Sequence, residues 1–568
     1  MRKYESGLAV LALAMLFAAA PAFAARGTDG ELKILFWQAV STLNPYLSGG
    51  VKEELASSLV LEPLAGFDEN AMLVPLLVVD IPTLENGGVS TDLTSVTWKL
   101  KPGLKWSDGA PLMADDVVFT WAYCTAPGGG CAQRAKFEGV KAVEAVDPLT
   151  VKVTFQGPKP FPYTAFVGAT SPIIQKAQFA NCLGAKAPGC TAANFAPIGT
   201  GPFKVQAFKP NDTISYAANE NYRDPEKPAF STVTLKGGGD ALSAARAVLE
   251  TGEYDYAWNT QIEPEVLQGM TGAGKGKVLT AFSSWVERID LNFDAADASL
   301  GDKRSTAQAG PHPILSDPAI RKALSAAIDR SAVVETAYGA AGKPTCNIIA
   351  GPDIYVSTAN DSCLKPDLAA VNALLDGAGW KMGPDGVRAK NGVKLSFVFQ
   401  SSTNSVRQTT QALLKDMWGQ IGAAVELRNI PPSVFFGGDP SSPDTFQKFY
   451  ADLQMYTVLY SGTDPESHLA SWLCNNIPSP SNGWQGENMS RYCDASYDRL
   501  FDELSRTASP ADRATIVKKL NDQLVGDGAV IPLVFRGAVS AFSNRLAGVR
   551  MSGWDSELAN VADWSRAK

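Results

Sequence analysis

The sequence predicts a mixed α/β protein divided into more than one lobe, and three observations support this. The chain has 568 residues, which is more than a single hydrophobic core organises. Segments that alternate polar and apolar residues lie between segments whose apolar residues recur at helical spacing. No unit of roughly 20 to 50 residues recurs along the chain, which argues against a solenoid.

The composition is that of a large folded protein that does not bind nucleic acid. Hydrophobic residues make up 45% of the chain and charged residues 19%, a balance that argues against disorder. The formal net charge of −8 provides no basic surface of the kind that nucleic acid requires.

The N-terminal segment has the pattern of a secretory signal peptide. Two basic residues precede an apolar run over 8–20, and 21–24 (PAFA) end in a small-x-small pattern. The apolar run is shorter than the roughly 20 residues that span a bilayer. We therefore expect a signal peptide over 1–25, cut between Ala24 and Ala25. No cysteine lies near the cut, so we expect no lipid anchor and a soluble protein outside the cytoplasm.

Four segments have the period-two alternation or the β-branched composition of strands. The first is 31–39, and 94–106 reads as two strands on either side of Pro102-Gly103. Alternation is clearest over 149–155, and 230–238 ends in glycines that stop a strand.

Four further segments have the pattern of amphipathic helices, namely 316–330, 370–380, 409–422 and 509–526. The first has a capping candidate at Ser316 or Asp317, followed by a proline in the first turn. The last opens with Pro510 and closes with Gly526. A segment over 526–535 predicts a strand that follows this last helix.

The stretch KWSDGAPLMADD (105–116) places three carboxylates close together. Ser107-Asp108-Gly109 has the composition of a tight turn. Asp115 and Asp116 directly precede an apolar segment, where carboxylates in a first helical turn face the positive end of the helix dipole. We therefore interpret the stretch as a turn followed by a helix start, in preference to a catalytic carboxylate pair.

Eight cysteines follow the predicted signal peptide, an even number that indicates disulfides in an exported protein. Eight cysteines allow 105 connectivities. Sequential pairing closes four short loops and is the pattern that we favour. A zinc site is disfavoured, because no pair has C-x-x-C spacing and the chain has two histidines. The favoured pairs are Cys124 with Cys131, Cys182 with Cys190, Cys346 with Cys363, and Cys474 with Cys493.

Five segments in order resemble the family 5 extracellular solute-binding proteins of ABC transporters, which include oligopeptide- and dipeptide-binding proteins. The turn-and-helix stretch is one of them, and its resemblance is reinforced by the four others. These are LEPLAGFDENAMLVPLLV (61–78), the segment beginning PIGTGPFKV (197–230), SDPAIRKALSAAIDRSAVVETAYGAAGKP (316–344) and ADLQMYTVLYSGTDPESHLASW (451–472).

The resemblance implies an α/β, two-lobed periplasmic-binding-protein fold (type II, cluster C-like) with an extra domain inserted in lobe I. A solute bound between the lobes gains contacts from both only when they close, so closure reports occupancy to a permease. The implied partners are an inner-membrane ABC permease and its ATPase, with the protein itself a periplasmic monomer that needs no cofactor. The implied segments are lobe I over 26–64, 197–300 and 527–568, the inserted domain over 65–196, and lobe II over 301–526.

The resemblance also implies which residues contact the ligand. In the peptide binders, an aspartate three residues before an Asp-Pro pair holds the α-amino group of the peptide. Here the pair is Asp464-Pro465 and that position is Ser461, whose neutral hydroxyl does not balance a buried ammonium. Arg288 is a candidate clamp for a carboxylate, with an internal ion pair to Glu287 or Asp290 as the alternative. The candidate ligand contacts are Trp258, Asn259, Trp285, Arg288, Tyr456, Tyr460 and Ser461.

Three readings of the function remain open. The leading one is capture of a short peptide or peptide-like organic solute without any catalysis. The second is the same fold with another solute, such as an opine-like or other carboxylate compound, an oligosaccharide or a metal complex. The third is a secreted hydrolase. The sequence contains no G-x-S-x-G or H-E-x-x-H motif, and neither His312 nor His468 lies in a catalytic motif, although chemistry by carboxylates alone stays open.

Overall fold

The computed structural model describes residues 26–48, 50–128, 131–436, 442–457, 460, 462–482, 484 and 486–568. The predicted signal peptide and Ser461 lie outside these ranges. Within the described ranges, no helix is long and apolar enough to cross a membrane.

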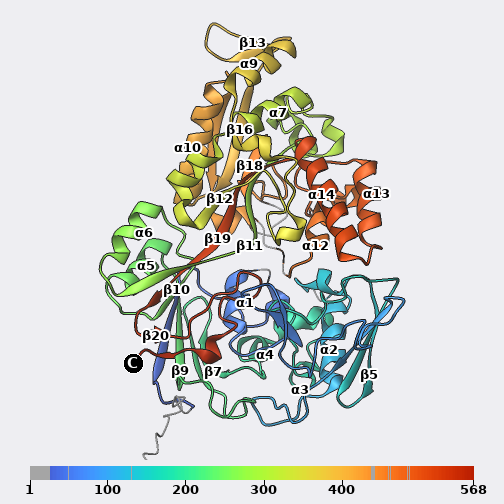
Figure 1. Cartoon of the computed structure of the whole chain (residues 1–568), viewed down its shortest axis with the longest axis vertical. Coiled ribbons are helices and arrows are strands. Elements are labelled where there is room, and N and C mark those ends of the chain that lie inside the picture. Colours follow the sequence, from blue (N-terminus) through green and yellow to red (C-terminus); the bar gives the residue numbers. More distant parts are fainter. Residues whose placement is uncertain are drawn as a thin grey trace, which may run out of the picture.

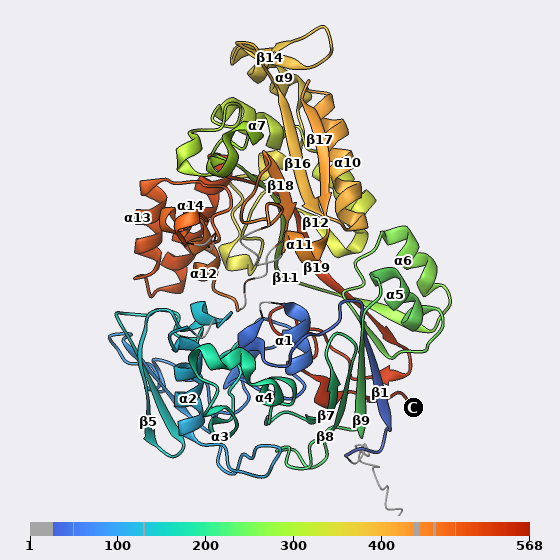
Figure 2. The same ribbon diagram turned by 180° about the vertical axis from the view of Figure 1, so that it is seen from behind.

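The chain folds into two bodies joined by two long strands (Figures 1 and 2). Strand β11 (Gly276–Leu291) and strand β19 (Val530–Ser543) are antiparallel and run from one body into the other. Their pairing extends from Gly276 opposite Ser543 to Asp290 opposite Val530, with irregularities between Phe282 and Val286 and again at Glu287. The two-lobed α/β fold predicted from the sequence is confirmed.

Both bodies are built on one mixed sheet, to which eleven strands among the described residues contribute. Its order is β17-β16-β18-β11-β19-β10-β1-β9-β8-β7, with β12 paired to β19. The lower body of Figure 1 holds one end of this sheet and the upper body the other. The bounds are β1 Glu31–Phe36, β7 Phe203–Lys209, β8 Thr213–Ala218, β9 Thr232–Gly237, β10 Tyr256–Trp258, β12 Gly342–Pro344, β16 Ser396–Ser402, β17 Ala424–Ile430 and β18 Leu453–Tyr456.

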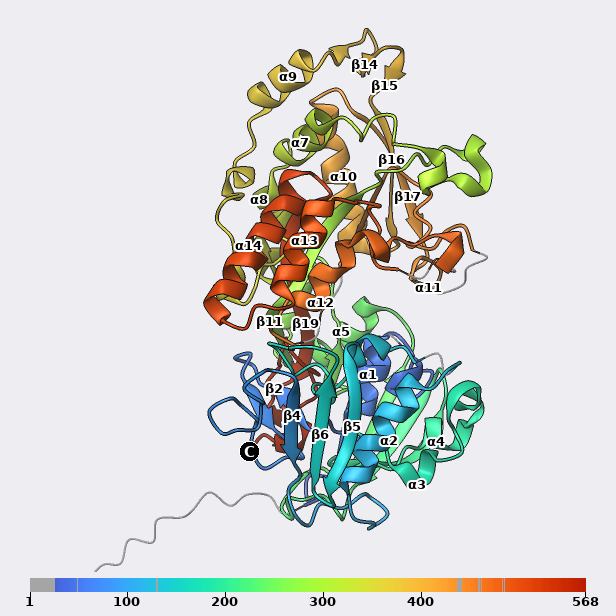
Figure 3. The same ribbon diagram turned by 90° about the vertical axis from the view of Figure 1, so that its right-hand side faces the viewer.

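Two of the hydrophobic cores of the lower body belong to its sheets. One lies under β1 and β7 to β10 and includes Leu32, Ile34 and Phe36, every second residue of β1. The other belongs to a second sheet of three strands, ordered β4-β6-β5, against which helix α2 packs (Figure 3). The elements of the lower body are α1 Val51–Ser57, β2 Ala65–Phe67, β3 Leu73–Pro75, β4 Ser95–Lys99, α2 Ala114–Thr125, β5 Val140–Asp147, β6 Thr150–Phe155, α3 Lys176–Phe179, α4 Thr191–Phe195, α5 Ala241–Leu249 and α6 Pro264–Thr271.

The upper body packs helices against both faces of its part of the sheet (Figure 2). Helices α7, α9 and α10 cover a core that includes Phe397, Phe399 and Trp418. Helices α13 and α14 enclose a second core. The helices of this body are α7 Pro318–Ala326, α8 Arg330–Val333, α9 Leu368–Gly377, α10 Ser405–Gly419, α11 Pro432–Phe435, α12 Glu466–Leu469, α13 Ala495–Leu504 and α14 Pro510–Gly526.

Capping residues explain where the predicted helices begin. Ser509 accepts a hydrogen bond from the backbone N–H of Asp512 at the start of α14. Asp317, one of the two candidates, caps α7 by accepting from the N–H of Ala319. This helix ends at Ala326, short of the predicted residue 330, because Asp329 caps a separate turn by accepting from the N–H of Ala332.

One predicted strand does not form among the described residues. The segment 94–106 forms β4 up to Lys99, but its second half is not a strand. Gly103 takes a positive φ of 78°, and Lys105 pairs only in an isolated bridge with Pro111. This half has no neighbouring strand among the described residues, so it forms a turn. Leu104 and Trp106 of this turn are nevertheless buried in the core.

The carboxylates of 105–116 act as the structural interpretation predicts. Asp108 accepts from the N–H of Ala110 in the turn. The side chain of Asp116 accepts from the N–H groups of Met113 and Lys176, which fixes the start of α2. Asp115 in the same first turn pairs with Lys176 at the surface.

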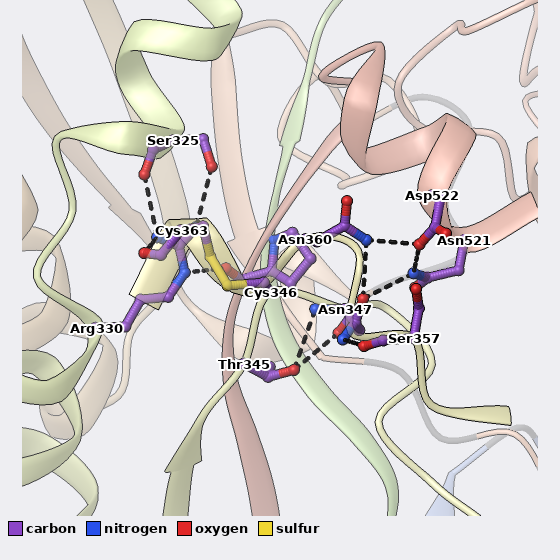
Figure 4. Close-up of a disulfide and its surroundings, with 11 residues drawn as sticks. Ser325, Arg330, Thr345, Cys346, Asn347, Ser357, Asn360, Cys363, Asn521 and Asp522 are labelled. Carbon is purple, nitrogen blue, oxygen red and sulfur yellow. Dashed lines mark hydrogen bonds between the residues drawn. A yellow bond between two sulfur atoms is a disulfide. The ribbon is translucent and has the colours of Figure 1, made fainter. Parts of the chain in front are cut away.

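All four cysteine pairs predicted by sequential pairing form disulfides. Figure 4 shows Cys346–Cys363 and its surroundings. The fully buried Arg330 donates to the carbonyl oxygen of Cys363 and to that of Pro532 on β19. Nearby, Asn347 accepts from Asn360 and from Asn521 of α14. The disulfide is therefore part of a polar network that ties this segment to β19 and α14.

Candidate functional site

A pocket of about 360 Å³ lies where the two bodies meet, beside the connecting strands. The lower body contributes α6 and the segment before it, and the upper body contributes the turn after α8 and the first turn of α10 (Figure 1). Strands β11 and β19 form the remaining wall. The lining residues are Gln261, Ile262, Pro264, Leu267, Gln268, Thr271, Val278, Thr280, Ala337, Tyr338, Ala340, Ala341, Val406, Arg536, Gly537 and Val539.

A close approach of the two bodies defines one side of this pocket. Gly339 takes a positive φ of 52°, and a Cβ atom there would lie 2.8 Å from side-chain carbons of Pro264. Glycine is therefore the residue that fits both the backbone conformation and the space. Pro264 itself begins α6, where its missing N–H costs no helical hydrogen bond.

A buried ionic cluster borders the pocket. Glu287 on β11 is fully buried and accepts from Nε of Arg407 at 2.7 Å and from Nη2 at 3.4 Å. Nη1 of Arg536 on β19 lies 3.7 Å from the same carboxylate. Two buried guanidinium groups thus share one carboxylate. Burial lowers the pKa of Arg536 to about 10, so this side chain is charged at neutral pH.

Several polar atoms of this region are buried without a hydrogen-bond partner among the described residues. On the pocket lining they are Nε of Arg536, the hydroxyl of Tyr338 and Nε2 of Gln261. Close by in sequence, Thr260 Oγ1 and Ser283 Oγ have none either. Such groups cost stability when they stay unpaired, and each of these atoms has almost no exposed surface.

Of the predicted contacts, Trp285 packs against Arg536 of this cluster, although it is not among the residues that line the pocket. Its ring is partly exposed, and the guanidinium of Arg536 lies 4.8 Å from the ring centroid. A flat aromatic surface beside a cation is suited to an organic solute.

Arg288 adopts the internal pair that the sequence left open. Its Nε donates to Asp290 at 3.3 Å, and its Nη2 donates to the hydroxyl of Tyr456 at 3.3 Å. The guanidinium also lies over the rings of Tyr456 and Trp472. The second oxygen of Asp290 is buried and forms no hydrogen bond with the described residues. Arg288 is therefore balanced in charge by Asp290.

Trp258 and Asn259 lie at the end of β10 in the lower body. Trp258 is buried against Phe36 and stacks on Trp37. Asn259 takes a positive φ of 54°, its carbonyl oxygen accepts from Trp37, and its N–H donates to Ser540. This conformation directs the following residues, including Gln261, toward the pocket.

Tyr460 and Asp464 have structural roles in this conformation. Tyr460 is buried, its hydroxyl donates to the carbonyl oxygen of Gly351, and its ring stacks on His468 at 5.0 Å. Asp464 accepts from Arg513 of α14 and from the N–H of Glu466, which agrees with the predicted turn role. Ser461 lies outside the described residues.

A second contact between the bodies lies on the other side of the connecting strands. Lys159 of the lower body pairs with Glu466 on α12 at 3.0 Å, and Glu466 also accepts from Arg513. Gly462 approaches Phe67 so closely that a Cβ atom would lie 3.2 Å from its ring. The two bodies are therefore in contact on both sides of the connection.

Neither histidine has the surroundings of a catalytic base. His312 lies beside Asp452 at 2.8 Å, and its Nδ1 accepts from the N–H groups of Ile314 and Leu315. His468 is packed between Tyr460 and Trp472, and burial lowers its pKa well below the usual value. Across the described part of the chain, no group of three or more His, Cys, Asp or Glu side chains is placed to hold a metal ion.

Sequence reasoning did not find Glu287, Tyr338, Arg407 or Arg536 as members of one site. Glu287 and Arg407 are 120 positions apart, and the site forms only when β11, α10 and β19 pack together. Arg407 and Arg536 stand in no motif that would single them out. Gln261 lies two residues beyond the predicted Asn259, which is the one sequence signal that points to the pocket.

The fold and this site define a protein of the solute-binding class, in which two lobes meet around a pocket. The chain matches the family described as bacterial extracellular solute-binding proteins, family 5 (middle region), over residues 54–479. The protein is therefore a member of the family 5 solute-binding proteins, as the sequence resemblance predicted.

Two of the curated relatives that match most of the chain show the range of similarity. Protein XP55 of Streptomyces lividans is 26% identical over 493 residues, covering 86% of this chain and 80% of the relative. The glutathione-binding protein GsiB of Escherichia coli K12 is 23% identical over 558 residues, covering 96% of each chain.

Three solved structures share the fold. The ABC transporter substrate-binding protein CtaP of Listeria monocytogenes has a TM-score of 0.76 at 22% identity and covers 95% of this chain and all of its own. The oligopeptide-binding protein AppA of Bacillus subtilis, in complex with a nonapeptide, has a TM-score of 0.74 at 20% identity, with 96% and 100% coverage. NikZ of Campylobacter jejuni, in complex with Ni(L-His), has a TM-score of 0.75 at 23% identity, with 94% and 99% coverage.

Proposed function

We propose that this protein is the periplasmic substrate-binding component of an ABC importer, which captures a short peptide or peptide-like organic solute between its lobes. The observation that carries the proposal is the pocket of about 360 Å³ whose walls come from both bodies, beside the two strands that connect them. A solute in this pocket stabilises the closed arrangement, because it contacts both bodies at once. The permease would bind the closed protein and receive the solute, and its ATPase would drive the transport.

The cargo is proposed from the site together with the relatives. The pocket combines mainly apolar walls with Tyr338 and the charged Arg536, as expected for a small organic solute that carries charge. The names of GsiB and AppA refer to glutathione and a peptide, and that of NikZ to a nickel complex. We favour a peptide-like solute that is bound without catalysis, as the family of solute-binding proteins suggests.

Native mass spectrometry of the protein purified from its host tests this function. We expect a co-purified organic solute of low mass. Adding that solute at 100 times its Kd should raise the free energy of unfolding by about 2.7 kcal/mol. Turnover of the solute into a product by the purified protein would contradict the proposal.

The ligand contacts Trp258, Asn259, Trp285, Arg288, Tyr456, Tyr460 and Ser461 remain proposals, and Arg288 provides a direct test. Substitution Arg288→Lys keeps a positive charge beside Asp290 but removes the planar fork of donors. We expect about a tenfold weaker Kd for the co-purified solute and a lower melting temperature, because the buried Arg288 also bonds Asp290 and Tyr456. Full affinity, measured by isothermal titration calorimetry, would remove Arg288 from the site.

The contact between Lys159 and Glu466 is expected to favour the closed arrangement. Both side chains are partly exposed, so their ion pair contributes about 0.5–1 kcal/mol. Substitution Lys159→Met should therefore weaken solute binding about two- to fivefold, mainly through faster dissociation. Stopped-flow measurement of the dissociation rate checks this, with Lys204→Met as a control because Lys204 pairs with Glu220 inside the lower body. An unchanged rate for Lys159→Met would show that the pair does not oppose opening.

A further inference from the structure

Arg536 occupies the point at which the pairing of the two connecting strands is interrupted. Phe282 on β11 lies opposite Gly537 on β19, and Val286 lies opposite Phe535. Three residues of β11 therefore stand opposite Arg536 alone. Such a local excess of residues disrupts the ladder of hydrogen bonds and lets a strand bend. The interruption is thus a suitable point for the two bodies to rotate about (Figure 1).

The guanidinium of Arg536 is buried with its donors incompletely paired. Arg536 is 3% exposed, and its Nε has no hydrogen-bond partner among the described residues. Its Nη1 lies 3.7 Å from the carboxylate of Glu287, which is longer than a hydrogen bond. That carboxylate is already held by Arg407, whose Nε donates to it at 2.7 Å. Buried donors without acceptors cost stability, so this arrangement of the two bodies is not the best one for Arg536.

A second carboxylate near Arg536 belongs to the lower body. Glu557 is buried, and its Oε2 accepts from the hydroxyls of Tyr256 at 2.8 Å and Ser540 at 2.6 Å. Its Oε1 accepts from none of the described residues. Burial raises the pKa of Glu557, and the charge of Arg536 acts in the opposite direction. Arg536 therefore lies close enough for the two charges to interact, and Glu557 has an oxygen available for it.

The two carboxylates lie on opposite sides of the interruption. Glu287 stands opposite Val534, toward the upper body. Ser540, which holds Glu557, lies on the same strand as Arg536 but toward the lower body. A bend at the interruption therefore changes the distance from Arg536 to Glu287, while Glu557 moves with the lower half of β19. Arg536 also borders the pocket of about 360 Å³, which gives its guanidinium room to turn.

We propose that Arg536 is an ionic switch at the hinge, which changes its carboxylate partner when the two bodies move apart. In the arrangement seen here it shares Glu287 with Arg407, and in the open arrangement it pairs with Glu557. The complete pair favours the open arrangement of the empty protein, so closure requires the interactions that a solute adds. This inference rests on the proposed function, because it takes the closed arrangement to be the one that a solute stabilises.

Pulsed electron paramagnetic resonance measures the arrangement of the empty protein directly. Nitroxide labels are attached through Lys141→Cys on β5 and Arg499→Cys on α13, two exposed positions in different bodies. Bound solute is removed by unfolding the labelled protein in guanidinium chloride and refolding it. The protein with its native Arg536 should then show mainly the longer of two label distances. In Arg536→Met, the ratio of short to long distances should rise at least about fivefold, because the open arrangement loses its ion pair and the closed one loses its unpaired donors.

A second variant tests the proposed partner. Glu557→Gln keeps the shape of the side chain and an oxygen for the two hydroxyl groups, but it removes the charge. The ratio should shift in the same direction as in Arg536→Met. The double variant should shift it no further than Arg536→Met alone, since the two side chains act as one pair. Arg545→Met is the control, because Arg545 pairs with Asp255 inside the lower body, and its loss should leave the ratio unchanged.

An unchanged ratio in either Arg536→Met or Glu557→Gln, or a shift toward the longer distance, would overturn the inference. Fully additive shifts in the double variant would overturn it as well, because they would show that the two side chains act independently. These outcomes are separate from failure of the proposed function. The ratio is measured in the empty protein and does not depend on the cargo, whereas the proposed function fails if no organic solute binds.

Discussion

Substitution Glu287→Gln is expected to lower the free energy of unfolding by about 3–5 kcal/mol. Glu287 is fully buried, and its carboxylate is the ion-pair partner of both Arg407 and Arg536. Glutamine keeps the shape but removes the negative charge, which leaves two buried guanidinium groups without a balancing anion. Urea unfolding followed by tryptophan fluorescence measures the loss.

A surface pair provides the control for this prediction. Glu250 pairs with Arg246 one turn away on α5, and both side chains are largely exposed. Glu250→Gln should therefore change the free energy of unfolding by no more than about 0.5 kcal/mol. If Glu287→Gln had an equally small effect, water or another group would have to balance the two arginines, and the buried cluster would not exist as described.

Removal of the disulfide between Cys346 and Cys363 is expected to cost about 3 kcal/mol. The two residues are 17 positions apart, and the loss arises mainly because the unfolded chain regains the freedom that this closed loop removes. The double substitution of both cysteines by alanine should show the loss in urea unfolding. The network of Asn347, Asn360 and Asn521 (Figure 4) should keep the folded loop in place, so solute affinity should change little.

The disulfide between Cys124 and Cys131 tests whether the loss of stability depends on loop length. It closes a loop of only 7 positions, for which the same relation gives about 2.4 kcal/mol. We expect the two double variants to rank in this order. A larger loss from the shorter loop would show that native contacts, rather than loop closure, determine the contribution of these bonds.

Local signals predicted much of the fold. The serine and proline before α14 and the aspartate and proline before α7 mark the starts of helices, because a cap acts on neighbouring backbone groups. The cysteine pairs were predictable because short loops close easily. The prediction of a strand in the second half of 94–106 was wrong, since a strand needs a neighbouring strand and the sequence does not show whether one lies alongside.

The candidate site was predictable only in part. Resemblance to the family pointed to Trp285 and Asn259, which lie next to the cluster and to Gln261. It also suggested Arg288 as a clamp, with an internal ion pair as the alternative, and the structure pairs this side chain with Asp290. Arg407 and Arg536 belong to the site because both pair with Glu287. These ion pairs join distant parts of the chain, and no local sequence pattern predicts them.

Small-angle X-ray scattering of the protein with and without its co-purified solute tests the central claim most directly. The account predicts a radius of gyration that matches this structure when solute is bound and a larger one after the solute is removed. Identical scattering in the two states, with binding verified by calorimetry, would contradict capture by closure of two lobes.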